Sequence, residues 1–318
     1  MKEKIRSFEQ LFSLAKKLAR ATGKTRAALI GADDALSLKA ILRAAEEGIL
    51  EPILIGSLSE IRKVAHESSV NIDTATVIDS SSRADEVVQA TRLVGAGDAD
   101  FLIRGNIPTA MMLARMFERP TGLREGGNHV SHVAVFEHSL YPKPLLLSDG
   151  AVTVAPDLSK KIAIIQNALK VAALFGVDVP RVAILAAVEL IHPSMPVTTE
   201  AAVISKMADK GQIENCLIDG PLSMDVAVIP EVARQKGVKS PVAGQADILI
   251  VPNIETGNAT YKAMAMFTGA KTAGVIVGAR VPISISSRCD TAESVFNSVV
   301  LGAVAALSGK QRRPESKS

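Results

Sequence analysis

The fold of this chain is decided by residues 240–297, SPVAGQADILIVPNIETGNATYKAMAMFTGAKTAGVIVGARVPISISSRCDTAESVFN. The stretch predicts an apolar strand at 247–252, a polar loop at 253–260 that opens onto a helix, and a second strand at 272–277. A third extended piece ends in Ser-Ser-Arg at 286–288. Small and polar residues therefore follow apolar strands, which is where open parallel α/β sheets bind ligands.

Working outward, helical and extended patterns alternate along most of the chain. The predicted helices span 8–21, 33–47, 58–68, 84–96, 109–117, 159–175, 198–210, 225–236 and 291–307, and the other predicted strands span 26–30, 51–55, 76–79, 101–104, 181–186 and 216–219. Strands separated by helices of 10–15 residues favour βαβ units. Two extended pieces, 129–136 and 144–148, have no full helix between them and predict an antiparallel pair. The fold class is therefore α/β, in two subdomains with mostly parallel sheets flanked by helices.

The composition supports this class and excludes several functions. The chain has 318 residues, 47% of them hydrophobic but only 3% aromatic, so Ala, Val, Ile and Leu must fill a core typical of parallel strands. Thirty-six basic and 33 acidic residues give a net charge of +3, too balanced to indicate nucleic acid as a partner. Two cysteines exclude a disulfide framework, and neither a signal peptide nor an 18-residue apolar run is recognised. We expect a cytoplasmic protein without a membrane partner.

Several motifs in order resemble those of one enzyme family. The decisive stretch contains PVAG-x-A, PN-x-x-x-GN-x-x-YK and SR-x-D, and residues 219–225 contribute DGPL-x-x-D. These motifs are similar to those of the phosphate acetyltransferase and phosphate butyryltransferase family. SHVAVFE at 131–137, LSDGAVTVAPDL at 147–158 and LAAVELIHPSMPVTTEAAVISKMADKGQI at 185–213 look closer to the butyryltransferase branch. The resemblance covers residues 28–306.

The resemblance implies an activity and an architecture. The reaction is acyl-CoA + phosphate ⇌ acyl phosphate + CoA, with a short or branched acyl chain, direct transfer in a ternary complex, and coenzyme A as a substrate. No metal or other cofactor is expected. The implied fold is similar to that of isocitrate and isopropylmalate dehydrogenases, with a first subdomain at 1–145 and 283–318, a second at 146–282, and a cleft between them. Similar proteins form homodimers or larger assemblies.

Arg288 and Ser287 are the first catalytic candidates. A guanidinium can hold two phosphate oxygens at once, and a hydroxyl can donate to the oxyanion that forms on the acyl carbon. The alternatives are a surface ion pair of Arg288 with Asp290 or Glu293, and a Ser287 hydroxyl that merely satisfies a turn. In the reverse direction a base must deprotonate the thiol of coenzyme A.

Asp290 and Glu293 are the candidates for that base. The acetyltransferase pattern carries an Asp six residues after its Arg, where this chain has Ser294, and we prefer the neighbouring Glu293. Both carboxylates could instead be first-turn acids that stabilise a helix N-terminus. Cys289 could act as a nucleophile, but no His neighbours it in sequence, so we interpret it as a bystander.

The remaining candidates bind phosphate or coenzyme A. Residues after predicted strands in the second half are Asp225, Asn253, Gly257, Asn258, Tyr261 and Lys262, and the first half contributes Arg104 and Thr109 from a basic-Gly-x-x-x-Thr turn, with Arg124 as a further cation. The alternative for each is a turn or helix cap without a ligand. No metal site is expected, because the histidines nearest in sequence, His129 and His132, point to opposite faces of an extended piece.

Three other functions are weighed. A related phosphate acyltransferase could take long acyl chains from acyl carrier protein. A non-catalytic sensor of acyl-CoA or acyl phosphate would keep the fold, and the displaced Asp favours it, whereas intact Ser287 and Arg288 do not. A dehydrogenase is disfavoured, because residues 95–100 lack the third glycine of a dinucleotide fingerprint and follow a helix rather than a strand.

Overall fold

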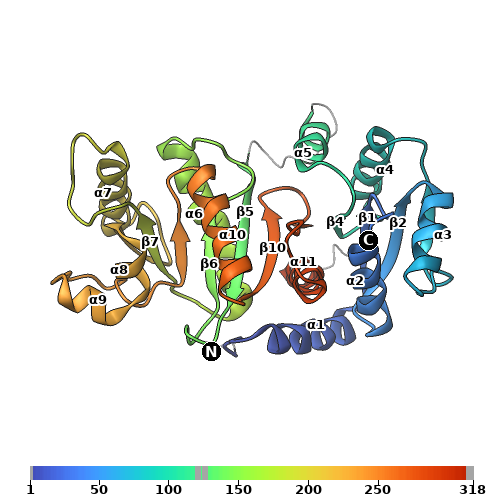
Figure 1. Cartoon of the computed structure of the whole chain (residues 1–318), viewed down its shortest axis with the longest axis horizontal. Coiled ribbons are helices and arrows are strands. Elements are labelled where there is room, and N and C mark those ends of the chain that lie inside the picture. Colours follow the sequence, from blue (N-terminus) through green and yellow to red (C-terminus); the bar gives the residue numbers. More distant parts are fainter. Residues whose placement is uncertain (1–2, 119–122, 124–127, 313–318) are drawn as a thin grey trace. The chain divides into compact units, whose positions relative to one another are not determined.

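The chain forms two compact units, which are described separately below. The computed structural model describes residues 3–118, 123 and 128–312 (Figure 1). The first unit comprises residues 8–128 and 272–318, and the second unit comprises residues 1–7 and 129–271. The subdomain boundaries expected from sequence, at 145/146 and 282/283, and the cleft stay predictions.

The first unit is a mostly parallel sheet with helices around it. Its strands are β1 (Thr25–Ile30), β2 (Leu50–Gly56), β3 (Thr76–Asp79), β4 (Phe101–Arg104), β10 (Lys271–Val277) and β11 (Ile283–Ser284), and its helices are α1 (Phe8–Thr22), α2 (Ala35–Glu46), α3 (Leu58–Glu67), α4 (Arg83–Ala96), α5 (Thr109–Phe117) and α11 (Ala292–Arg312). The strand order is β3-β2-β1-β4-β11-β10, and only the β10–β11 pair of this run is antiparallel.

Burial explains why these strands are apolar. Residues 27–30 of β1 have no exposed surface, as expected for a strand between two parallel neighbours with helices on both faces. The last helix, α11, packs against α1, α2 and β4 of the same unit. Its segment Ala292–Lys310 is long and apolar enough to cross a membrane by length and composition alone, but 72% of the tested window is buried inside the protein. We therefore interpret α11 as a core helix.

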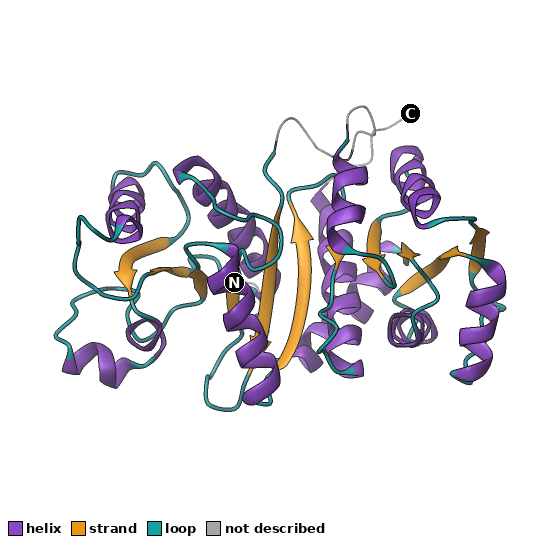
Figure 2. Ribbon diagram, turned by 45° about the horizontal axis from the view of Figure 1, so that its top comes forward, coloured by secondary structure: helices purple, strands orange, loops and turns teal. Residues whose placement is uncertain are grey.

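The second unit also combines mostly parallel strands with helices. Figure 2 shows the helices of the chain in purple and the strands in orange. Its strands are β5 (Ser131–Glu137), β6 (Leu145–Ser148), β7 (Arg181–Leu185), β8 (Leu217–Leu222) and β9 (Ile248–Ile250), and its helices are α6 (Leu158–Ala172), the 3-10 turn η1 (Ala173–Phe175), α7 (Pro196–Asp209), α8 (Met224–Val228), α9 (Pro230–Gln235) and α10 (Ile254–Phe267). The order is β5-β6-β9-β7-β8. The β5–β6 pair is antiparallel, as predicted, and the other pairs are parallel.

The predicted α/β class is confirmed, and several elements differ from the sequence-based prediction. The single helix expected at 225–236 is two short helices, α8 and α9, because Pro230 has no N–H to donate and starts a new helix. The loop expected at 253–260 is the beginning of α10. The side chain of Asn253 accepts a hydrogen bond from Thr256 N at 3.0 Å, and this cap starts the helix at Ile254.

Strand β8 also runs further than predicted. The predicted strand ends at Asp219, whereas Gly220 and Pro221 also lie within β8. Proline is tolerated there because β8 is the last strand of the sheet order, so no further neighbour needs its missing N–H.

Candidate active site

In the first unit, Arg104, Ser287, Arg288 and Asp290 come together at the carboxyl ends of β4 and β11. These strands are parallel, with Ser284 level with Ile103, so the residues that follow them emerge side by side. Arg104 ends β4 and reaches across: its Nη2 donates to the carbonyl oxygen of Ser286 at 2.8 Å. Its Nη1 donates to the carbonyl oxygen of Ile107 at 2.9 Å. The basic turn and the Ser-Ser-Arg segment, 182 residues apart in sequence, are thus joined directly.

Residues 287–290 form a closed turn. The N–H of Ser287 donates to Oδ2 of Asp290 at 2.7 Å, and the N–H of Asp290 donates to the carbonyl oxygen of Ser287 at 3.0 Å. Both main-chain groups of Ser287 are therefore occupied, and its hydroxyl lies 3.2 Å from Sγ of Cys289. Asp290 is 9% exposed, and its carboxylate serves the turn.

Arg288 stands at the tip of this turn and is exposed. Within the described part of the chain, its guanidinium makes neither of the ion pairs that were the alternative to phosphate binding. Burial lowers the pKa of Arg104, and the positive charge of Arg288 lowers it further, whereas the carboxylates of Asp34 and Asp290 raise it. Two guanidinium groups thus lie within electrostatic range, an arrangement that an anion would stabilise.

Glu293 lies in the first turn of α11 and points its carboxylate to Arg43. The two form an ion pair of 2.8 Å, and the side chains of Glu293 and Arg43 are 53% and 48% exposed, respectively. Arg43 also stacks over the ring of Phe296, 3.7 Å from its centroid. An ion pair with this exposure contributes only about 0–1 kcal/mol, so it can open at little cost.

The turns after β1 and β4 are pressed together. The N–H groups of Gly105 and Asn106 donate to the carbonyl oxygens of Ile30 and Gly31, at 2.8 and 2.9 Å. A Cβ on Gly105 would lie 2.3 Å from the oxygen of Gly31, so only glycine fits. Thr109 follows as the first residue of α5 and is half-buried.

Charged residues that the sequence reasoning missed share this edge of the sheet. Arg83 donates to both carboxylate oxygens of Asp33, at 2.6 and 2.8 Å, and to Glu86 at 2.9 Å. Asn106 also donates to Asp33, at 3.2 Å, and the pairing with Arg83 helps to hold the pKa of Asp33 below its ordinary value against the effect of burial. The sequence did contain one sign of this cluster, because Asp33 follows the predicted strand 26–30, a position typical of ligand-binding residues.

In the second unit, three candidates of α10 have structural roles. Asn253 caps the helix, as described above. A Cβ on Gly257 would lie 2.7 Å from Cα of Gly150, so the close approach it permits is to the protein's own backbone. Tyr261 is 7% exposed and packs against Phe136, with ring centroids 5.6 Å apart.

The other two α10 candidates are open to solvent. Asn258 and Lys262 are exposed and lie four residues apart, which places them on one face of the helix. Asn258 also donates to the carbonyl oxygen of Gly150 at 3.4 Å. Asp225, at the start of α8, is exposed and lies 3.4 Å from Lys236, which also pairs with Glu189 at 3.0 Å. Arg124 lies outside the described residues.

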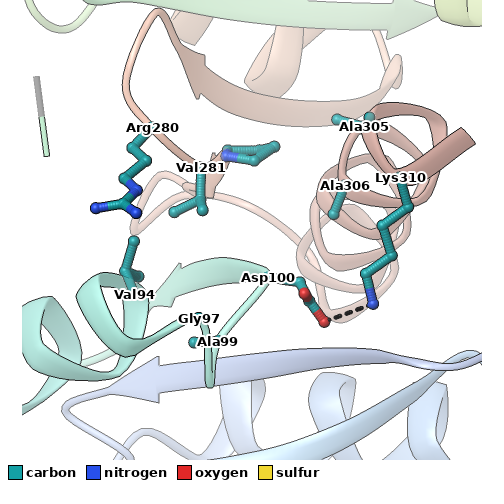
Figure 3. Close-up of a pocket in the computed structure, with 11 residues that line it drawn as sticks. Val94, Gly97, Ala99, Asp100, Arg280, Val281, Ala305, Ala306 and Lys310 are labelled. Atoms are coloured by element: carbon teal, nitrogen blue, oxygen red, sulfur yellow. Dashed lines mark hydrogen bonds and ion pairs between the residues drawn. The ribbon is translucent and has the colours of Figure 1, made fainter. Parts of the chain in front are cut away.

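A cavity of about 260 Å³ in the first unit lies away from these residues (Figure 3). Its lining includes Asp100 and Lys310, which form an ion pair of 2.8 Å, and Arg280. Asp100 precedes β4 and Arg104 ends it, a separation of roughly 13 Å along an extended strand. The cavity therefore belongs to the amino end of β4, and the candidate residues to its carboxyl end.

His129 and His132, the two histidines near β5, contact different residues. Nε2 of His129 lies 2.8 Å from the hydroxyl of Thr153, whereas His132 is 6% exposed and lies beside Tyr261. Among the described residues, no group of three or more His, Cys, Asp or Glu side chains could hold a metal ion.

Comparisons with known proteins place the chain in one family. The profile of a family described as phosphate acetyl/butaryl transferase matches residues 80–303. The chain is 40% identical over 281 residues to the phosphate butyryltransferase of Clostridium acetobutylicum, covering 88% of this chain and 93% of that relative. It is 38% identical over 287 residues to the phosphate acetyltransferase of Thermotoga maritima, covering 90% and 97%.

A solved structure shares the fold. The branched-chain phosphotransacylase from Enterococcus faecalis V583 aligns with a TM-score of 0.77 at 31% sequence identity. The alignment covers 89% of this chain and 99% of that one.

Proposed function

This chain belongs to the phosphate acetyltransferase and phosphate butyryltransferase family, and we propose that it catalyses acyl-CoA + phosphate ⇌ acyl phosphate + CoA with short or branched acyl chains. Two relatives, at 40% and 38% identity, carry the butyryl and acetyl versions of this activity in their names. The similar solved structure, at 31% identity, is that of a branched-chain phosphotransacylase, which supports the choice of branched substrates.

One observation carries the proposal: an exposed guanidinium, Arg288, stands on a closed turn beside Ser287, within electrostatic range of a second guanidinium, Arg104. Arg288 would bind phosphate through paired N–H groups. The Ser287 hydroxyl would donate to the oxyanion of the tetrahedral species, where donors of this kind contribute about 10²–10³-fold to the rate.

The reaction balances without an added oxidant or reductant. An oxygen of hydrogen phosphate attacks the thioester carbon, the C–O bond forms, and the C–S bond breaks to release coenzyme A as thiolate. The proton of hydrogen phosphate passes to Glu293 and from there to the thiolate. The step therefore needs no redox cofactor, and from the family resemblance we propose no metal.

In the second unit, Asn258 and Lys262 are proposed to contact the phosphates of coenzyme A, since both are exposed on one face of α10. Asn253, Gly257 and Tyr261 would keep that helix in place. Asp225, Arg104 and Thr109 remain proposed binding residues, and the role of Arg104 is refined below. A cytoplasmic homodimer or larger assembly is proposed from the family resemblance.

The test is a free-thiol release assay with acetyl-, butyryl- and isobutyryl-CoA, with and without phosphate. We expect phosphate-dependent release with butyryl- or isobutyryl-CoA. Arg288→Ala should lose about 10²-fold or more in turnover while staying folded. Arg280→Ala is the matched control, because Arg280 is also exposed but lines the cavity at the other end of β4.

Binding of acyl-CoA without phosphate-dependent thiol release would contradict the proposed enzyme and favour a non-catalytic sensor of acyl-CoA or acyl phosphate. Release only from acyl chains carried on acyl carrier protein would favour the long-chain acyltransferase.

A further inference from the structure

The peptide group between Ser286 and Ser287 is held from both sides. Arg104 donates to its oxygen at 2.8 Å, and its N–H donates to Asp290 at 2.7 Å. One peptide plane therefore lies between a guanidinium and a carboxylate. Hydrogen bonds with an ionised partner are roughly twice as strong as those between neutral groups, so this plane is held more firmly than an ordinary turn.

We propose that Arg104 and Asp290 are positioning residues, which fix this peptide group and thereby aim the Ser287 hydroxyl and the Arg288 guanidinium at the reacting atoms. The inference rests on the proposed function of the site. It changes the roles expected from sequence, because Arg104 then acts through Ser286 rather than on phosphate, and Asp290 acts through Ser287 rather than as the base.

The contacts of Arg104 favour this role. Both terminal nitrogens already donate to main-chain carbonyls, one on its own turn at Ile107 and one on the turn after β11. Its Nε is buried and has no hydrogen-bond partner among the described residues. The guanidinium thus links the turn after β4 to the turn after β11. The first loop is itself fixed, because Gly105 and Asn106 are bonded to the end of β1.

The contacts of Asp290 point the same way. Its carboxylate accepts from Ser287, its own N–H donates back to Ser287 at 3.0 Å, and its side chain is largely buried. A base at this position would have to weaken the bond that closes the turn each time it took a proton. Among the residues that the structure describes, Glu293 makes no such bond to the turn and forms an exposed ion pair with Arg43.

One consequence concerns the oxyanion. Because the N–H of Ser287 is already given to Asp290, the donor that this residue can offer to substrate is its hydroxyl. The direction of that hydroxyl depends on the peptide plane that precedes it. We call the two hydrogen bonds that hold this peptide group, from Arg104 and to Asp290, the clamp. A misplacement of about 1 Å at a reacting centre can lower the rate about 10²-fold, so loss of the clamp should lower kcat.

The first test separates the roles of Asp290 by substitution. Asp290→Asn keeps an acceptor oxygen for Ser287 but is no longer a base, whereas Asp290→Ala removes both properties. We expect Asp290→Asn to retain kcat within about fivefold and Asp290→Ala to lose about 10²-fold. Equal losses of about 10²–10⁴-fold in both variants would identify a general base and overturn the inference.

The second test separates positioning from phosphate binding at Arg104. We expect Arg104→Met to lower kcat by about 10–10²-fold and to change the KM for phosphate by less than about threefold. The combined loss in Arg104→Met/Asp290→Ala should fall well below the product of the single losses, since both act on one peptide group. An increase in the phosphate KM at unchanged kcat would show a direct phosphate contact instead.

A third readout does not depend on activity. Amide hydrogen exchange at Ser287 should become faster in Arg104→Met and in Asp290→Ala but not in Asp290→Asn. Arg62→Gln, at an exposed position of α3, is the matched control for loss of a charge. Unchanged exchange in both variants would overturn the clamp even if the enzyme is active. If wild-type protein shows slow amide exchange at Ser287 that Arg104→Met and Asp290→Ala accelerate, but releases no thiol, the proposed function is overturned and the clamp is retained.

Discussion

Glu293 is the residue on which proton transfer depends in the proposed reaction. Its carboxylate is exposed and, within the described part of the chain, is held by an ion pair with Arg43, and such a pair opens at little cost. We expect Glu293→Gln to lower kcat by about 10²–10⁴-fold in both directions, because the same proton moves in each. The thiol-release assay and its reverse, with acyl phosphate and coenzyme A, measure this loss.

The matched variant is Arg43→Gln, which removes the ion pair but leaves the carboxylate. It should retain most of the turnover. If Glu293→Gln is as active as wild type, the carboxylate serves only the start of α11, and proton transfer passes directly between phosphate and thiolate.

At Gly257 the need for glycine has a structural cause in the protein's own backbone. The sequence suggested that it lets the backbone approach a ligand. The structure shows that a Cβ on Gly257 would lie 2.7 Å from a neighbouring backbone, but that backbone is Gly150, which follows β6. The requirement for glycine is the same, because both interpretations need an uncrowded Cα.

At the scale of elements, α11 packs tightly against the sheet at Gly302. A Cβ on Gly302 would lie 2.1 Å from Oγ of Ser284 and 2.9 Å from the ring of Phe101. The hydroxyl of Ser284 is itself bonded to the carbonyl oxygen of Ser298 at 2.8 Å, so it has little freedom to yield. We expect Gly302→Ala to lower the free energy of unfolding by about 1–3 kcal/mol through overpacking, measured by urea unfolding.

Gly309→Ala in the same helix is the control. Apart from its chain neighbours and the backbone of its own helix, no atom of the described residues lies within 4 Å of a Cβ at Gly309, so alanine adds only helix propensity and should stabilise by about 0.5–1 kcal/mol. Equal effects of the two substitutions would mean that α11 does not pack against β4 and β11 as described.

At the scale of the whole molecule, stability should fall as the solution becomes mildly acidic. Burial lowers the pKa of His132 from its ordinary value of 6.5, and Asp149 offsets part of that shift. The unfolded chain therefore takes up a proton at this residue before the folded chain does. The contribution is complete above pH 6.5 and is lost as the pH falls through the lower pKa of the folded state.

Thermal unfolding of wild type between about pH 7.5 and pH 5 measures this loss, in a range above the ordinary pKa of carboxylates. We expect the melting temperature to fall with pH, and His132→Gln to flatten the dependence. His66→Gln, at an exposed position of α3, should leave it unchanged. A wild-type melting temperature that is constant over this range would contradict the prediction.

The order of residues alone was enough for the fold class, most strand and helix positions and the family. β3, β4 and α5 begin and end where the sequence predicts, because the apolar residues of each lie between clear turn signals. Local rules misjudged α8, α9 and the start of α10, where one proline and one asparagine outweighed the apolar pattern.

What only the tertiary structure decided is which candidates act together. Arg104 meets Ser286 across 182 residues of sequence, and Asp33 meets Arg83 across 50. No local pattern records such contacts, because they arise when parallel strands bring their carboxyl ends to one edge of a sheet. In the sequence, Arg104 and Asp290 looked like independent contacts to substrate. In the folded chain both are hydrogen-bonded to the peptide group between Ser286 and Ser287, and Arg288 beside it is exposed.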